Sequence, residues 1–93
     1  MDNEAGEGFR DAFQELLEEF GENFHVAGET KRGVFSEQKG TTKISFSPGE
    51  FSLKHGDVII HWATEEKYAV LSAKSCTIAG VAVNFEATVV PRS

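Results

Sequence analysis

The sequence predicts an α+β fold, in which one N-terminal amphipathic helix packs on a small antiparallel β-barrel or sandwich of about six strands. Two observations predict it. An apolar stripe of helical period occupies the start of the chain, and short alternating β runs separated by turn residues fill positions 23–90. One helix followed by closely spaced strands is typical of a curled sheet covered by that helix. With 93 residues, the chain (1–93) makes a single domain, with an acidic helical region over 1–22 and a β domain over 23–90.

A helix is predicted over residues 7–20. Apolar residues recur there at intervals of three and four, which gathers them on one face. This stripe consists of Phe9, Ala12, Phe13, Leu16, Leu17 and Phe20. Gly21 follows the last of them, where a left-handed C-cap is expected. Because six apolar side chains are too many to leave in water, we expect the stripe to cover one face or one open end of the sheet.

The other face of this helix is acidic. Residues 1–22 carry eight acids against one base, whereas the rest of the chain is close to neutral. An acidic face of this kind is ordinarily exposed to solvent, and the helix is stabilised by the packing of its apolar face. The alternative is that it meets a basic surface on another subunit. On that hypothesis Glu15, Glu18 and Glu19 are candidate partner-docking residues.

Six β runs are predicted after the helix, at residues 23–27, 34–36, 43–47, 57–62, 67–72 and 77–90. In the fourth run, Val58 and Ile60 are expected to face the core, with His61 at the surface. A loop of four or five residues joins this run to the fifth, and Trp62 and Tyr68 are expected to lie together across the hairpin. The residues predicted to be largely buried are Phe13, Leu16, Val58, Ile60, Val70, Val83 and Phe85.

Turn residues separate these runs. Residues 53–58 contain a Lys-x-Gly-Asp turn, preceded by a turn or short extended piece over residues 50–53. Gly80 is interpreted as a bulge or sharp bend within one long terminal strand. Residues 37–42 are predicted to form a polar, mobile loop that only a neighbouring subunit orders. This loop supplies further candidate partner-docking residues, namely Glu37, Gln38, Lys39, Gly40 and Thr41.

The sequence offers no pattern for catalysis. Its histidines, His25, His55 and His61, lack metal-ligand spacing, and its one cysteine, Cys76, has no evident base beside it. The net charge of −6 disfavours nucleic-acid binding, which depends on basic side chains. The start of the chain has no signal-peptide pattern, and no apolar run approaches the about 20 residues that span a bilayer. We therefore expect a soluble intracellular protein that is not an enzyme, has no catalytic residues, cofactor or metal site, and binds neither membranes nor specific nucleic-acid sequences.

The order of these features resembles the small head–tail joining (head completion) proteins of long-tailed bacteriophages and prophages. The resemblance rests on the acidic helix, the polar loop, the alternating strand and three short motifs. The motifs are Gly33-Val34-Phe35, Lys54-His55-Gly56-Asp57 and Tyr68-Ala69-Val70. It spans roughly residues 9–90, and its specificity lies in the order and spacing of these motifs.

This resemblance implies a structural protein of the head–tail connector, which forms a ring that joins or closes the DNA-filled head and docks the tail. Its partners would be the portal or adaptor ring, the tail terminator and further copies of itself. It would occupy the host bacterial cytoplasm during assembly and then the virion. A tail-terminator or another connector-ring subunit is the nearest alternative. Two other classes remain open: a small non-phage β-barrel that binds a protein partner through a strand edge, and an enzyme subunit or ligand-binding barrel.

Overall fold

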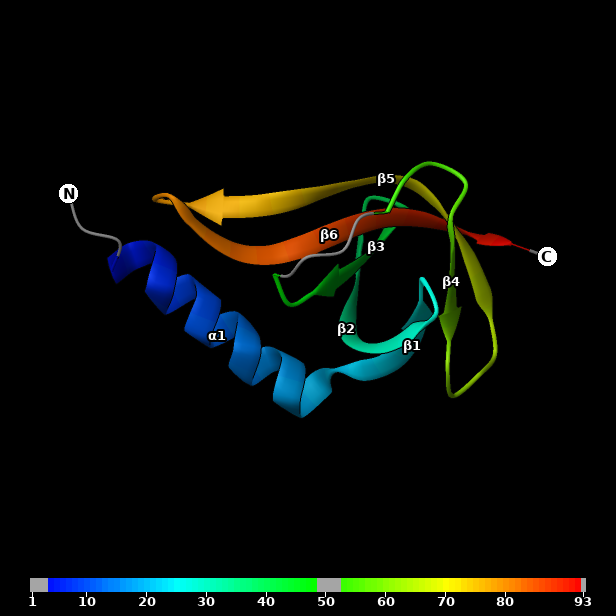
Figure 1. Cartoon of the computed structure of the whole chain (residues 1–93), viewed down its shortest axis with the longest axis horizontal. Helices are drawn as coiled ribbons and strands as arrows, with labels where there is room; N and C mark the ends of the chain where they lie inside the picture. Colours follow the sequence, from blue (N-terminus) through cyan, green and yellow to red (C-terminus); the bar gives the residue numbers. More distant parts are fainter. Residues whose placement is uncertain (1–3, 49–52, 93) are drawn as a thin grey trace.

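The computed structural model describes residues 4–48 and 53–92, and it confirms the predicted α+β fold class (Figure 1). The elements are α1 (Glu4–Phe20), β1 (Glu22–Val26), β2 (Glu29–Gln38), β3 (Thr41–Phe46), β4 (Val58–His61), β5 (Lys67–Ile78) and β6 (Val81–Arg92). The strands form a closed antiparallel barrel in the order β1-β2-β3-β6-β5-β4, and β4 pairs with β1 to close it. This closure selects the barrel over the sandwich. The piece predicted over residues 50–53 lies, up to residue 52, outside the described residues.

The barrel interior is filled by alternate residues of the strands. Phe24 of β1 is fully buried, and its ring meets that of Phe46 edge to face at a centroid distance of 5.9 Å. Among the predicted core residues, Val70, Val83 and Phe85 are buried as expected. The central cluster comprises Phe24, Val26, Ile44, Phe46, Ile59, Tyr68, Val70, Phe85, Ala87 and Val89.

β4 presents to the core the face opposite to the predicted one. Ile59 and His61 are buried, whereas Val58 and Ile60 are only half-buried. Residues 58–60 are all apolar, so alternation alone does not choose the inner face of this strand. Pairing with β1 makes that choice, because buried Phe24 stands opposite His61 and directly opposed residues point to the same side.

The expected Trp62–Tyr68 pair does not form. The loop between β4 and β5 has the predicted length, residues 62–66, but Tyr68 stands opposite Ile59 and is buried. Trp62 begins the loop and is 62% exposed. The reversed face of β4 accounts for this separation, since it turns Trp62 outward while Tyr68 stays on the core side with Val70.

β5 and β6 form a long hairpin in place of the single bent strand predicted from residue 77 onward. Ala79 and Gly80 make its turn, with φ of 51° and 81°. Two-residue hairpin turns with positive φ at both positions match the twist of the flanking strands, and glycine adopts such a φ without steric cost. The outer part of this hairpin projects from the barrel on the same side as α1 (Figure 1).

The polar loop predicted over residues 37–42 is instead the paired end of the β2–β3 hairpin. Glu37 pairs with Thr42 and Gln38 with Thr41, so only Lys39 and Gly40 form the turn. The prediction of a loop is wrong because polar residues on an exposed hairpin end need no buried face to pair through their backbones. The mobility of this segment stays a prediction.

α1 packs along β6 through one edge of its apolar stripe. Leu17 is 6% exposed and Phe13 is half-buried, whereas Leu16, predicted to be buried, is 41% exposed. Gly6 lies so close to the β5–β6 hairpin that a Cβ there would collide with Val81. The face that carries Gly6 therefore makes the close contact, because a residue without a side chain lets the helix approach the hairpin.

Arg32 of β2 caps the C-terminus of α1. Its Nε donates to the carbonyl of Leu17 at 2.8 Å and its Nη2 to the carbonyl of Glu18 at 3.2 Å. The expected left-handed cap at Gly21 is wrong, since the φ of this residue is not positive. A cation at this end complements the helix dipole, and it fixes the helix to the barrel.

The Lys-x-Gly-Asp turn forms as predicted, and backbone hydrogen bonds join it to β5. The N–H of Asp57 donates to the carbonyl of Lys54 at 3.0 Å, and Asp57 Oδ2 accepts from the N–H of Lys54 at 3.0 Å. Gly56, with a φ of 96°, donates to the carbonyl of Val70 at 2.9 Å. Val70 in turn donates to the carbonyl of Asp57 at 2.8 Å.

Candidate functional site

The candidate docking residues fall on two separate exposed surfaces. Glu15, Glu18 and Glu19 lie on α1, and residues 37–41 lie at the β2–β3 turn. Gly33 of β2 pairs with β1 beside the end of α1, whereas the turn lies at the far end of the strand. The five residues of strand from 33 to 38 span about 17 Å. The structure therefore does not bring the two groups together.

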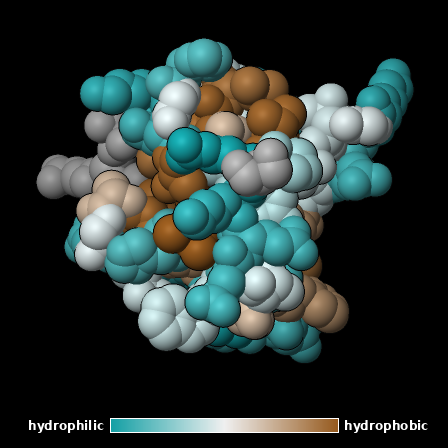
Figure 2. All heavy atoms as spheres, turned by 90° about the vertical axis from the view of Figure 1, so that its right-hand side faces the viewer, coloured by the Kyte–Doolittle hydropathy of each residue, from teal (hydrophilic) through white to brown (hydrophobic). Residues whose placement is uncertain are grey.

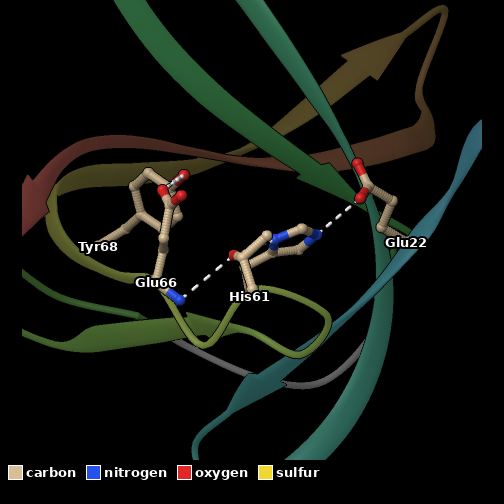
Figure 3. A network of polar contacts seen from close by, with 5 residues as sticks. Glu22, His61, Glu66 and Tyr68 are labelled. Carbon is tan, nitrogen blue, oxygen red and sulfur yellow. Dashed lines mark hydrogen bonds and ion pairs between the residues drawn. The ribbon is translucent and has the colours of Figure 1, made fainter.

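A polar network around His61 lies where β1 and β4 close the barrel (Figure 3). His61 is 6% exposed, its Nε2 is 2.6 Å from Glu22 Oε1, and its Nδ1 is 2.7 Å from Thr64 Oγ1. Its ring packs against those of Phe24 and Phe35, at centroid distances of 5.1 and 5.3 Å. A buried imidazole thus joins a carboxylate at the start of β1 to a hydroxyl of the β4–β5 loop.

Tyr68 and Glu66 lie on the other side of His61 in Figure 3. The Tyr68 hydroxyl donates to Glu66 Oε2 at 2.9 Å, and its ring contacts that of Phe35 at 5.4 Å. Burial raises the pKa of Tyr68 above its ordinary value of 10.0, and the hydrogen bond to Glu66 and the charges of Glu66 and Glu22 raise it further. The phenol is therefore a neutral hydrogen-bond donor at neutral pH.

Sequence reasoning missed this network because it placed His61 at the surface. The available signal was the spacing of His61 two residues after Ile59, together with the buried pattern of β1. A hydroxyl, an imidazole and a carboxylate in a row resemble a proton relay. Here, however, the Thr64 hydroxyl also accepts the N–H of Glu66 at 3.3 Å, which is a local turn contact. The contacts of His61 thus tie β1, β4 and the loop together.

Two open hollows of similar size lie on the barrel. One, of about 480 Å³, is lined by Phe35, Ser36, Glu37, Thr42, Tyr68 and Pro91. The other, of about 470 Å³, is lined by His25, Ile60, Trp62, Ala63 and Glu65. Each lining contains a single carboxylate, and neither contains His61.

The end of the molecule that carries β4 and the β4–β5 loop is mostly hydrophilic (Figure 2). Its hydrophobic side chains gather in separate patches between polar ones. His25 Nδ1, in the second hollow, is buried and makes no hydrogen bond within residues 4–48 and 53–92. The larger exposed apolar surface lies on α1, where Phe9, Leu16 and Phe20 are 55%, 41% and 64% exposed.

Metal ligands do not cluster in the part of the chain that the structure describes, which contains no group of three or more His, Cys, Asp or Glu able to hold an ion. Cys76 is a free, half-buried thiol. In the same described ranges, no helix combines the length and the apolar character needed to cross a bilayer. Comparisons of the chain with family models, with curated proteins and with solved structures find no match.

Proposed function

We propose that this chain is a structural protein of a phage or prophage head–tail connector, one copy of a ring that joins or closes the DNA-filled head and docks the tail. The proposal is supported by the placement of the motifs that suggest it. Gly33-Val34-Phe35 lies in β2, Lys54 to Asp57 form the hydrogen-bonded turn, and Tyr68-Ala69-Val70 begins β5. The motifs therefore lie in β2, in the turn that precedes β4 and in β5 of one barrel.

The observation that carries the proposal is the arm formed by α1 and the outer β5–β6 hairpin. Both leave the barrel on the same side, and the molecule measures 47 × 29 × 26 Å (Figure 1). The arm exposes Phe9, Leu16 and Phe20, which a free-standing barrel has no reason to leave in water. A ring subunit needs such surfaces, because it contacts a copy on either side and a different ring above or below it.

The partners follow from this role. A portal or adaptor ring would contact one surface and a tail terminator another, within the host bacterial cytoplasm and then the virion. The acidic helix face, with Glu15, Glu18 and Glu19, suits a basic ring surface. A tail terminator or another connector layer has the same requirements, and separate binding assays with portal rings and with tail tubes distinguish these positions in the stack.

Binding to portal rings tests the proposal. Wild-type chain should be retained by purified portal or adaptor rings of the same virus, and tail-less particles supplied with it should gain a density layer below the portal by electron microscopy. Reversal of Glu15, Glu18 and Glu19 to Lys should weaken retention, most strongly at low salt, where screening is least. Portal, capsid and tail genes beside its own gene would agree with this role. Metabolic neighbours, or undiminished retention of the reversed variant, would overturn it.

A protein-interaction module is the second candidate, favoured by the edge of β5. Beyond Val70, no strand within the described residues pairs with β5 on the side away from β6. Such an edge can accept a strand from another chain. This candidate predicts that Ser75→Pro blocks partner binding, whereas the connector proposal assigns docking to the helix.

A further inference from the structure

Two parallel rows of residues run along α1 with the same spacing. Gly6, Phe13 and Leu17 form the row that packs on β6, and Phe9, Leu16 and Phe20 form the exposed row. Within each row, the second residue comes seven positions after the first, and the third comes four positions after the second. Each residue of the exposed row comes three positions after its counterpart in the packed row. At 3.6 residues per turn, the exposed row therefore lies about 60° around the helix from the packed row.

The exposed row is held in a fixed position. Arg32 binds the carbonyl oxygens of the last turn of the helix, and Gln14 Nε2 donates to Ser47 Oγ at 3.1 Å. Close contact at Gly6 secures the other end against the hairpin. Because both ends and the middle are fastened, the helix cannot rotate to bury Phe9 and Phe20 without breaking these contacts.

The charges beside the exposed row are negative. Glu19 lies one turn after Leu16, on the side away from the packed row, and Glu15 lies farther around the helix on that side; both are exposed. Arg10, the one base of the first 22 residues, lies on the opposite side of the packed row by helical position. A partner that covers the apolar row and extends past its outer border therefore meets the Glu19 carboxylate first and that of Glu15 next.

The size and the charge of the row argue against a second copy as its main occupant. Taking about 200 Å² for each large side chain, the three residues expose roughly 300 Å². A stable dimer buries about 800 Å² on each partner. Pairing two copies through this row would also set Glu15 and Glu19 of one copy beside those of the other, which like-charge repulsion opposes.

We infer that the Phe9–Leu16–Phe20 row is a docking surface for an amphipathic helical segment of a different protein, whose apolar ridge is bordered by lysine or arginine. Apolar anchors spaced one turn apart on the segment would cover the rings and Leu16, and its basic side chains would reach Glu15 and Glu19. The inference goes beyond the connector role, since it specifies the chemistry of the segment whichever protein carries it.

A labelled model peptide tests this inference. The probe is a helical peptide of Leu and Lys with its Leu residues at helical spacing, and the control peptide has the same composition in scrambled order. We expect saturable binding of the amphipathic peptide by fluorescence anisotropy, with at least about tenfold weaker binding by the F9Q/F20Q variant. Both positions are exposed, so circular dichroism of this variant should match that of the wild type.

A matched pair of charge reversals locates the acidic border. Glu19→Lys lies beside the exposed row, whereas Glu7→Lys makes the same charge change on the far side of the packed row. Glu19→Lys should weaken peptide binding severalfold more than Glu7→Lys at low salt.

Three results would overturn the inference: equal effects of the two reversals, equal binding of the scrambled peptide, or unchanged binding by F9Q/F20Q. So would a wild-type dimer that F9Q/F20Q converts to monomer, since the occupant would then be a second copy. Loss of peptide binding with intact retention on portal rings would remove this inference alone.

Discussion

At the residue scale, adjacent residues of the helix differ sharply in how far they are buried. Leu16 and Leu17 are both members of the apolar stripe, yet only Leu17 is buried against the sheet. The same holds at the end of β4, where His61 is buried and Trp62, the first residue of the following loop, is exposed. In both cases a contact with another element outweighs the hydropathy of the residue itself.

The leucine pair gives a direct test of helix packing. Leu17→Ala should lower the free energy of unfolding by about 2–3 kcal/mol, because it removes a buried side chain and leaves a cavity. Leu16→Ala removes the same atoms from a position that is 41% exposed and should cost less than about 1 kcal/mol. Urea denaturation of the two variants measures the difference. Equal costs would mean that α1 does not pack through the Leu17 face.

Tyr68 predicts a loss of stability in alkali. Its pKa is raised in the folded protein, chiefly by burial, so the phenol ionises more readily in the unfolded chain. The stability that neutral Tyr68 contributes is complete below pH 10 and is lost as the pH rises through the folded-state pKa. Tyr68→Phe should remove this part of the alkaline loss, measured as a shallower slope of unfolding free energy against pH.

A spectroscopic titration provides the control. Tyr68 is the only tyrosine of the chain, so phenolate absorbance reports this residue alone. The folded protein should titrate at higher pH than the chain unfolded in urea. Coincident titration curves would contradict the burial of the hydroxyl.

At the element scale, three hairpins share one kind of turn. Residue pairs 27–28, 39–40 and 79–80 each have positive φ at both positions, with glycine second. Turns of two residues fix the register of the strands that they join. They also set how far each strand extends, which is how the β5–β6 hairpin comes to project beyond the barrel.

Two glycine substitutions with opposite expected effects on stability test this role of the turns. Gly80→Ala should destabilise the protein by about 1 kcal/mol or more, because alanine is strained at a φ of 81°. Gly8→Ala should instead stabilise it by about 0.5–1 kcal/mol, since Gly8 lies within α1, its φ is not positive and a Cβ there meets no atom within 4 Å. Thermal melts of the two variants should therefore shift in opposite directions. A stabilising effect of Gly80→Ala would contradict the turn geometry.

At the scale of the whole molecule, the barrel and the arm differ in the surfaces that they expose. The barrel closes through the β1–β4 pairing and the His61 network, which removes the sheet edges at that seam. The arm keeps the free edge of β5 and the apolar row of α1 exposed. Figure 1 shows that α1 and the outer β5–β6 hairpin lie on the same side of the barrel.

The isolated chain should be a monomer. Its net charge is −6, and eight of its fifteen acids lie in residues 1–22, so contact between identical helices is opposed by repulsion. Sedimentation at physiological salt should give the mass of one 10.2 kDa chain. A stable ring formed by the protein alone would contradict this prediction, and high salt is the condition most favourable to such self-association.

The sequence by itself determined the fold class, the helix and the Lys-x-Gly-Asp turn. The period of the apolar residues predicted α1, the alternating runs predicted a curled sheet, and the Lys-x-Gly-Asp motif predicted the turn at Asp57. These are local properties, because they depend on residues that are neighbours along the chain. The acidic face of the helix is equally plain from the order of residues.

Only the tertiary structure decided which side of each element is buried. In β4, three apolar residues in a row leave the inner face undetermined until β1 sets Phe24 opposite His61. On α1, the close approach at Gly6 and the Arg32 cap select Leu17 over Leu16. The exposed apolar row and the buried histidine network both follow from these choices. Each depends on contacts between residues distant in sequence, and no local pattern encodes them.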